Sequence, residues 1–155
     1  MAKPIPDGYS TITAHLTISD PHQTVDFYKR GLGAEELFNI PTPDGRVMHM
    51  ELKIGNSIFM VAEAGQMGSK SPKDYGGASS SIMLYTEDVD ALFQRAVAAG
   101  ATVKMPPQDM FWGDRWAMIE DTSGHVWQMA THKEDVPPEE MSRRFEEMMK
   151  QQKPQ

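Results

Sequence analysis

The chain has 155 residues, with 22 acidic and 15 basic side chains and a formal net charge of −7. This length suits one domain with its own core, and scattered basic residues in an acidic chain argue against nucleic acid as a partner. The absence of cysteine excludes disulfides, thiol nucleophiles and thiolate metal ligands. Because there is no long apolar run and no signal-peptide pattern, we expect no membrane partner and a cytoplasmic protein.

The first half of the chain predicts a βαβββ unit. Residues 11–18 alternate as a half-buried strand does, with Ile12, Ala14, Leu16 and Ile18 on one face. Asp20 as N-cap, Pro21 at the first helical position and Gln23 three residues after the cap predict the start of a helix. Glycines at 31 and 33 end it. Three strands are then predicted at 34–40, 46–54 and 57–63.

The same order returns after a linker, residues 65–80, which is rich in Gly and Ser and holds no predicted element. A strand at 81–86, a helix capped by Asp88, a strand at 101–105 and two strands turning at Ser123–Gly124 follow. Asp20 matches Asp88 at an offset of about 68 residues, which indicates an internal repeat. The modules are about 9–64 and 81–133.

The end of the chain changes character. Residues 1–135 are predicted as one domain, and 136–155 as a helical tail opened by prolines and glutamates. Met141, Phe145 and Met148 or Met149 form one apolar stripe on this helix. Such a stripe would expose apolar surface unless it is covered, so we expect a homodimer.

The stretch from Gln108 to Lys133 holds all three tryptophans and mixes them with charged residues. Trp112, in a predicted loop, is a candidate ligand contact, whereas the alternation around Trp116 and Trp127 predicts two core positions. Asp109 and Arg115 are candidate ligand-binding residues because a guanidinium suits carboxylates or phosphates. The alternative is an Asp–Arg pair that only holds the loop.

Two tandem units carrying HQTVDFYKRGLGAEELF and EDTSGHVWQMATHK resemble the vicinal-oxygen-chelate superfamily, which includes glyoxalases, bleomycin-resistance proteins and extradiol dioxygenases. The segments DGRVMHMELKIG and AGATVKMPPQDMFWGDR resemble its PhnB-like branch. The resemblance implies an α+β fold in which two βαβββ modules form curved mixed sheets around a cavity. Function must still be deduced from the site, because one fold hosts many chemistries.

The resemblance also locates the positions where metal-dependent members hold a cation, which here carry Thr13, Met60, Ser81 and Gln128. Hydroxyl, thioether and amide groups are poor ligands for zinc, nickel or iron. We therefore expect no metal and no other cofactor, and keep Met60 and Gln128 as candidate ligand contacts.

Three titratable residues are expected near the same cavity. If Thr13 points inward so does His15, and the alternation of RVMHMELKI puts His49 and Glu51 on one face. They are the candidate catalytic residues, as general base, proton shuttle and orienting carboxylate or as a displaced metal triad. The alternative is that the histidines are ordinary strand residues and Glu51 faces water. His125 is predicted to be structural, His22 solvated, and His132 a weaker candidate.

Three functions remain open: a binding protein for a small polar or aromatic metabolite or drug, a metal-independent enzyme using His15, His49 or Glu51, and a metal-dependent lyase or isomerase. Missing metal ligands favour the first and clustered titratable residues the second. We predict a small-molecule-binding protein, with catalysis left open.

Overall fold

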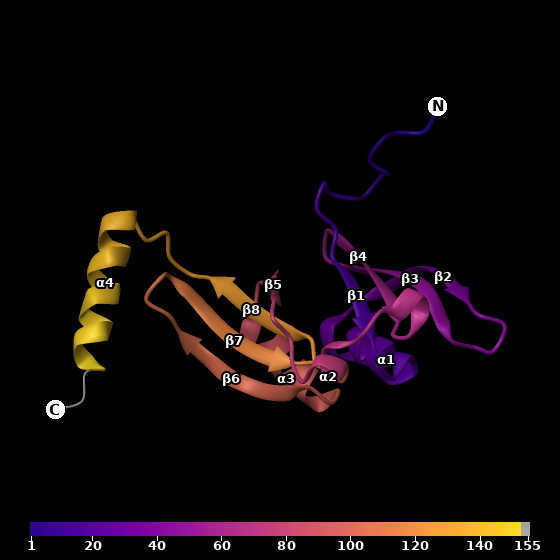
Figure 1. Ribbon diagram of the computed structural model, residues 1–155. Coiled ribbons are helices and arrows are strands. Elements are labelled where there is room, and N and C mark those ends of the chain that lie inside the picture. The colour runs from indigo at the N-terminus through magenta and orange to yellow at the C-terminus, as the bar shows by residue number, and fades with distance from the viewer. Residues whose placement is uncertain (153–155) are drawn as a thin grey trace.

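The computed structural model describes residues 1–152, so the last three residues of the predicted tail lie outside the described part. Two four-stranded mixed sheets have the strand orders β1-β4-β3-β2 and β5-β8-β7-β6 (Figure 1). Module one contains β1 (His15–Ile18), α1 (Pro21–Leu32), β2 (Glu35–Pro41), β3 (Val47–Ile54) and β4 (Ser57–Glu63). Module two contains β5 (Ser81–Tyr85), α3 (Val89–Ala98), β6 (Thr102–Asp109), β7 (Asp114–Glu120) and β8 (Val126–His132). The predicted α+β fold of two βαβββ modules and a C-terminal helix, α4 (Pro138–Gln151), is confirmed.

The linker is more ordered than its composition predicts. It holds a 3-10 turn at Gln66–Gly68 and a short helix, α2 (Pro72–Tyr75). Pro72 takes the first helical position, and Asp74 accepts a hydrogen bond from the backbone N–H of Ser71 at 2.7 Å. The prediction of no element between 65 and 80 was therefore wrong, because a capping box nucleates one turn without apolar periodicity.

Two local predictions in module one were also wrong. Strand β1 begins at His15 rather than residue 11, and Ile12 is 89% exposed. Asp20 is left-handed (φ 46°) and its side chain caps nothing, whereas Asp88 accepts from the backbone N–H of Ala91 at 3.0 Å as predicted. The helix start at Pro21 is nevertheless correct, because proline fixes φ there.

One hydrophobic core joins the two modules. It lies between the helix-facing sides of both sheets and helices α1 and α3, and buries Leu52, Val61, Ile119 and Met129 completely. Tyr28 packs against Phe59 and Trp127 with ring centroids 5.6 and 5.5 Å apart.

A buried carboxylate ties this aromatic group together. Asp121 accepts hydrogen bonds from Tyr28 Oη at 2.6 Å and from Trp127 Nε1 at 3.0 Å. Burial and the neighbouring Asp121 raise the pKa of Tyr28 well above its usual value. Tyr28 belongs to module one, whereas Asp121 and Trp127 belong to module two, so these hydrogen bonds hold the two modules together.

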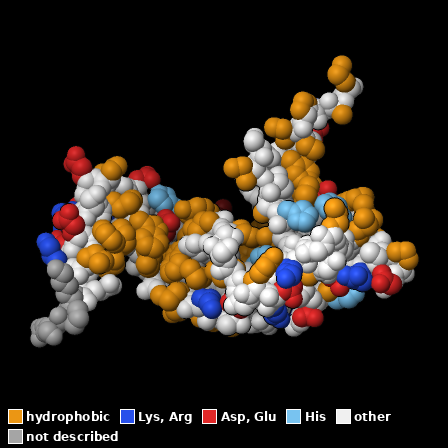
Figure 2. Space-filling view, viewed as in Figure 1, with side chains coloured by type: hydrophobic (Ala, Val, Ile, Leu, Met, Phe, Trp, Pro, Cys, Tyr) orange, Lys and Arg blue, Asp and Glu red, His pale blue; other side chains and the backbone are white. Residues whose placement is uncertain are grey.

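Helices α1 and α3 do not cover the opposite side of either sheet. We call these sides the first open face, on the sheet of module one, and the second open face, on the sheet of module two. They expose large apolar side chains, including Phe38 (49%), Met83 (39%), Tyr85 (63%) and Met105 (40%). Figure 2 shows hydrophobic side chains gathered over the part of the molecule that carries β6, β7 and α4. Helix α4 stands at one extremity and buries none of its residues (Figure 1). Within residues 1–152, no helix has the length and apolar character needed to cross a membrane.

Candidate functional site

The internal repeat places equivalent side chains on the two open faces. Across the first sheet, His15, Met60, Glu51 and Phe38 lie in register on β1, β4, β3 and β2. Across the second, Met83, Gln128, Met118 and Met105 occupy the same places on β5, β8, β7 and β6. The first open face therefore carries titratable groups where the second carries thioethers and one amide.

The predicted catalytic residues come together on the first open face. The rings of His15 and His49 lie 6.3 Å apart, and His49 Nε2 is 3.4 Å from Glu51 Oε1. His49 and Glu51 alternate with Met50 and Leu52, which are buried in the core, as predicted for this part of β3. At the start of the strand the alternation breaks, since Val47 is buried and Met48 is 52% exposed where the pairing with β2 shifts register. Phe38 borders the group, with its ring 6.5 Å from that of His49.

Tyr9 is a member of this group that the sequence did not indicate. Its hydroxyl is buried and makes no hydrogen bond with any group in residues 1–152. Burial and the nearby Glu51 carboxylate, which opposes a second negative charge, raise the pKa of Tyr9 to about 12. Tyr9 lies in the segment before β1, where no periodic pattern could have pointed to it.

The second open face is aromatic. Phe145 of α4, Phe111, Trp112 and Trp116 form a continuous row with successive ring centroids 5.6, 5.1 and 6.0 Å apart. Trp127 is a core residue as predicted, but Trp116 is not part of the central core. It is buried on the open face, where its Nε1 donates to Gln128 at 3.0 Å. Alternation alone did not reveal which face of β7 is covered by helices.

Asp114 organises the edge of this aromatic row. Its carboxylate, on a residue only 4% exposed, accepts from Trp112 Nε1 at 3.1 Å, Tyr85 Oη at 3.4 Å and His132 Nδ1 at 2.7 Å. The other nitrogen of His132 lies 2.8 Å from Asp135. Hydrogen bonds to Asp135 and to Asp114 raise the pKa of His132, because both favour the imidazolium. Trp112 is thus held at a fixed orientation.

Asp109 and Arg115 do not join the open faces. Arg115 makes two hydrogen bonds to Asp90 of α3, at 2.6 and 2.9 Å, and a longer one of 3.3 Å to Asp109. Asp90 and Asp109 raise the pKa of Arg115 further above its usual value. The arrangement matches the alternative reading of a pair that holds structure, with a helix carboxylate as the main partner.

The positions that would hold a metal carry side chains that do not fit one. Gln128 accepts from Trp116 and donates to Ser81 Oγ at 2.6 Å, and Thr13 donates to the backbone of Ser10. Hydroxyl, amide and thioether groups supply neither charge nor strong basicity to a divalent cation. Among residues 1–152, no three or more His, Asp or Glu side chains are disposed to bind a metal ion, so geometry does not support a relocated triad.

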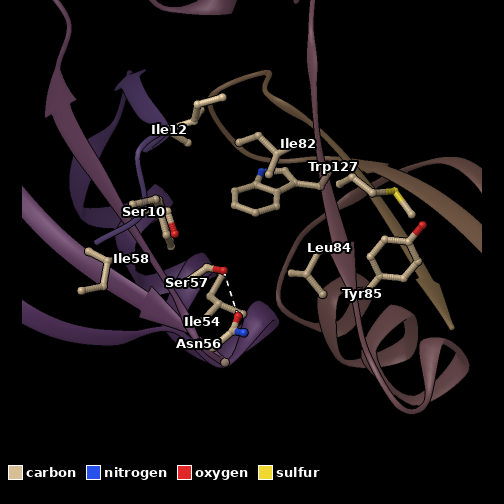
Figure 3. Close-up of a pocket in the computed structure, with 14 residues that line it drawn as sticks. Ser10, Ile12, Ile54, Asn56, Ser57, Ile58, Ile82, Leu84, Tyr85 and Trp127 are labelled. Carbon is tan, nitrogen blue, oxygen red and sulfur yellow. Dashed lines mark hydrogen bonds between the residues drawn. The ribbon is translucent and has the colours of Figure 1, made fainter. Parts of the chain in front are cut away.

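A separate cleft of about 500 Å³ lies between the two sheets, beside the open edge of β5 (Figure 3). Ile12, Ile54 and Ile58 approach it from module one, and Ile82, Leu84 and Trp127 from module two. None of His15, His49, Glu51 or Trp112 lines it. The alternation and the repeat predict that these four residues line one cavity, but His15, His49 and Glu51 lie on the first open face and Trp112 lies beside Trp116 on the second, so within one chain that prediction is wrong.

Comparison with protein families gives a match over residues 11–129 to the Glyoxalase/Bleomycin resistance protein/Dioxygenase superfamily. The chain belongs to this superfamily. Its two sheets and repeated βαβββ order agree with that assignment.

Relatives in the superfamily support the fold without naming a reaction. An uncharacterised protein of Mycobacterium tuberculosis is 40% identical over 122 residues, covering 76% of this chain and 72% of the relative. TioX from a Micromonospora species is 32% identical with a TM-score of 0.64, covering 79% of this chain and 98% of TioX. An antibiotic-binding protein from a Streptomyces species is 23% identical with a TM-score of 0.59, covering 81% and 100%. At that identity the last shows the fold alone.

Proposed function

We propose that this superfamily member binds a small polar or aromatic molecule without a metal ion, and that two copies pair to enclose it. The observation that carries the proposal is the chemistry of the two open faces. One offers His15, His49 and Glu51 for hydrogen bonding, and the other offers a row of aromatic rings for stacking. Ligand pockets combine apolar walls with a few polar groups in this way.

Pairing of two copies explains how these faces meet. Within one chain the helix-covered sides of both sheets share a core, and the candidate residues lie on the opposite sides. Each chain carries one polar and one aromatic face, so a twofold dimer can oppose unlike faces twice. It would also cover exposed Phe38, Met83 and Met105, whose apolar surface is unusual for a monomer.

Binding of a drug-like molecule fits the relatives. A structurally similar Streptomyces protein is described as antibiotic-binding, and bleomycin resistance is part of the superfamily's description. The membership of the PhnB-like branch stays a prediction, as does a cytoplasmic location.

Native mass spectrometry of protein purified without chelator tests the proposal directly. We expect a dimer that carries copurified small molecules and less than stoichiometric metal. A monomer at micromolar concentration would contradict the pairing. Stoichiometric zinc or nickel that is lost in Gln128→Ala but retained in His49→Ala would contradict metal-independent binding, because Gln128 stands at the superfamily's ligand position.

A metal-independent enzyme is the second candidate, and the His49–Glu51 contact favours it. A carboxylate beside an imidazole orients the ring, and an oriented imidazole suits a general base. A substrate turned over by wild-type protein, but not by His49→Gln at equal binding, would establish this function. Binding with no turnover would favour the first.

A further inference from the structure

The two histidines of the first open face are spaced for one shared ligand atom, an inference that rests on the proposed pocket. His15 lies on β1 and His49 on β3, with β4 between them, yet their ring centroids are 6.3 Å apart at an interplanar angle of 31°. Each ring nitrogen is about 1.1 Å from its centroid, so two nitrogens turned toward each other would be separated by roughly 4 Å, too far for a direct hydrogen bond.

A ligand oxygen atom between the rings could form a hydrogen bond with each imidazole. With hydrogen bonds of about 2.8 Å to each side, one oxygen can bridge two imidazoles whose centroids are up to roughly 8 Å apart. We propose that His15 and His49 clamp a single acidic oxygen of the ligand, such as that of a phenol, enol or carboxylic acid. The site thereby selects ligands by an ionisable oxygen as well as by aromatic surface.

The contact to Glu51 assigns different roles to the two rings. When His49 donates its Nε2 proton to Glu51, its other nitrogen is an acceptor in the neutral ring. An incoming ligand O–H donates to that nitrogen and transfers its proton, leaving an oxyanion beside an imidazolium that Glu51 stabilises. His15 donates an N–H to the same oxyanion. No proton is lost in this step, since it moves from the ligand oxygen to His49.

Tyr9 lies close to Glu51 in the same group of residues. Burial and Glu51 raise the pKa of Tyr9 to about 12, so its buried hydroxyl stays protonated into the alkaline range. A neutral phenol beside the carboxylate leaves the negative charge of Glu51 directed to His49 rather than shared with a second anion.

The test compares para-nitrophenol with para-nitroanisole, which has the same ring but a methylated oxygen. At a pH where free para-nitrophenol is mostly protonated, wild-type protein should bind it as the phenolate, visible by absorbance, and about tenfold more tightly than the anisole. His49→Gln should abolish the phenolate signal, and His15→Gln should remove most of the preference. His22→Gln, which changes an exposed histidine of α1, is the matched control and should leave both unchanged.

Each other outcome is decisive. Equal binding of both probes without a phenolate signal overturns the clamp but leaves the pocket intact, whereas binding of neither at millimolar concentration overturns both proposals. A ligand-induced shift of the imidazole nitrogen resonances of His15 and His49 in the wild-type protein, with those of His22 unmoved, supports the clamp even if a variant fails to fold. Unmoved resonances of His15 and His49 in a saturated complex overturn it.

Discussion

The indole nitrogen of Trp112 donates a hydrogen bond to the carboxylate of Asp114 at 3.1 Å. The bond fixes a partly buried ring at the rim of the second open face, next to Phe111 and Trp116. Because Trp112 belongs to the aromatic row and not to the central core, its loss should affect binding more than folding.

Trp112→Ala should weaken binding of para-nitroanisole by about tenfold, as for an aromatic anchor of a binding site. The free energy of unfolding should fall by only about 1 kcal/mol, from the lost hydrogen bond. Calorimetric titration and urea denaturation measure the two quantities. Trp112→Phe keeps a ring and should retain most of the binding; collapse of the fold in either variant would remove Trp112 from the site.

Trp127→Ala should give the opposite pattern. Trp127 is 2% exposed and packs against Tyr28 and Phe59, so its truncation opens a cavity where the two modules meet. We expect a loss of about 3 to 5 kcal/mol in the free energy of unfolding. The variant also removes the indole N–H that donates a hydrogen bond to the buried Asp121 carboxylate, which destabilises the folded protein further. Urea denaturation that shows a loss comparable to that of Trp112→Ala would contradict the shared core.

The raised pKa of Tyr28 predicts that the folded protein loses stability at alkaline pH. This pKa is raised in the folded protein by burial and by Asp121, whereas in the unfolded chain it is about 10. The stabilisation is therefore fully present below pH about 10 and declines above it, as the unfolded chain releases a proton that the folded protein retains. Denaturation midpoints across alkaline pH should fall less steeply in Tyr28→Phe than in wild type.

Tyr28→Phe should also lower the free energy of unfolding at neutral pH. It removes the 2.6 Å hydrogen bond to Asp121, so we expect a loss of about 1 to 3 kcal/mol there. Tyr9 and Tyr85 also have raised pKa values in the folded protein, so part of the fall in stability with alkaline pH should remain in Tyr28→Phe. An alkaline slope identical to that of wild type would show that Tyr28 does not retain its proton.

Features set by neighbouring residues could be predicted from the sequence, whereas features set by distant contacts could not. Asp88 caps α3 because its side chain needs only the backbone three residues later. Asp20 holds the equivalent place in the repeat but adopts a left-handed conformation, and its carboxylate lies 3.8 Å from Lys73 of the linker. The sequence cannot show this second environment.

In the candidate site too, local features could be predicted from the sequence and long-range contacts could not. Alternation in β3 correctly grouped His49 with Glu51, since side-chain direction repeats every two residues. It could not assign Trp116, because both faces of β7 carry large apolar residues and only the placement of α3 decides which is covered. The convergence of Tyr85, Trp112 and His132 on Asp114 joins three segments, and no spacing in the chain encodes it.

Gly113 provides a sharp test of how the Trp112 loop is held. A Cβ at this position would lie 2.2 Å from the backbone oxygen of Glu134, and the Gly113 carbonyl accepts from the backbone N–H groups of Lys133 and Glu134. Its φ of 102° also disfavours any L side chain. Gly113→Ala must therefore separate the loop from the segment that leads to α4.

Gly100 is the matched control, since its φ is 113° but an added Cβ would meet nothing within 4 Å. Gly100→Ala should lower the free energy of unfolding by about 1 to 2 kcal/mol, the penalty for a residue with a Cβ at positive φ, and leave binding of para-nitroanisole unchanged. Gly113→Ala should cost more and also weaken binding of para-nitroanisole, because Trp112 and Phe111 move with the loop. Urea denaturation and calorimetric titration of both variants measure these effects. Equal losses in the two variants, with binding intact in both, would mean that the close approach to Glu134 does not position the aromatic row.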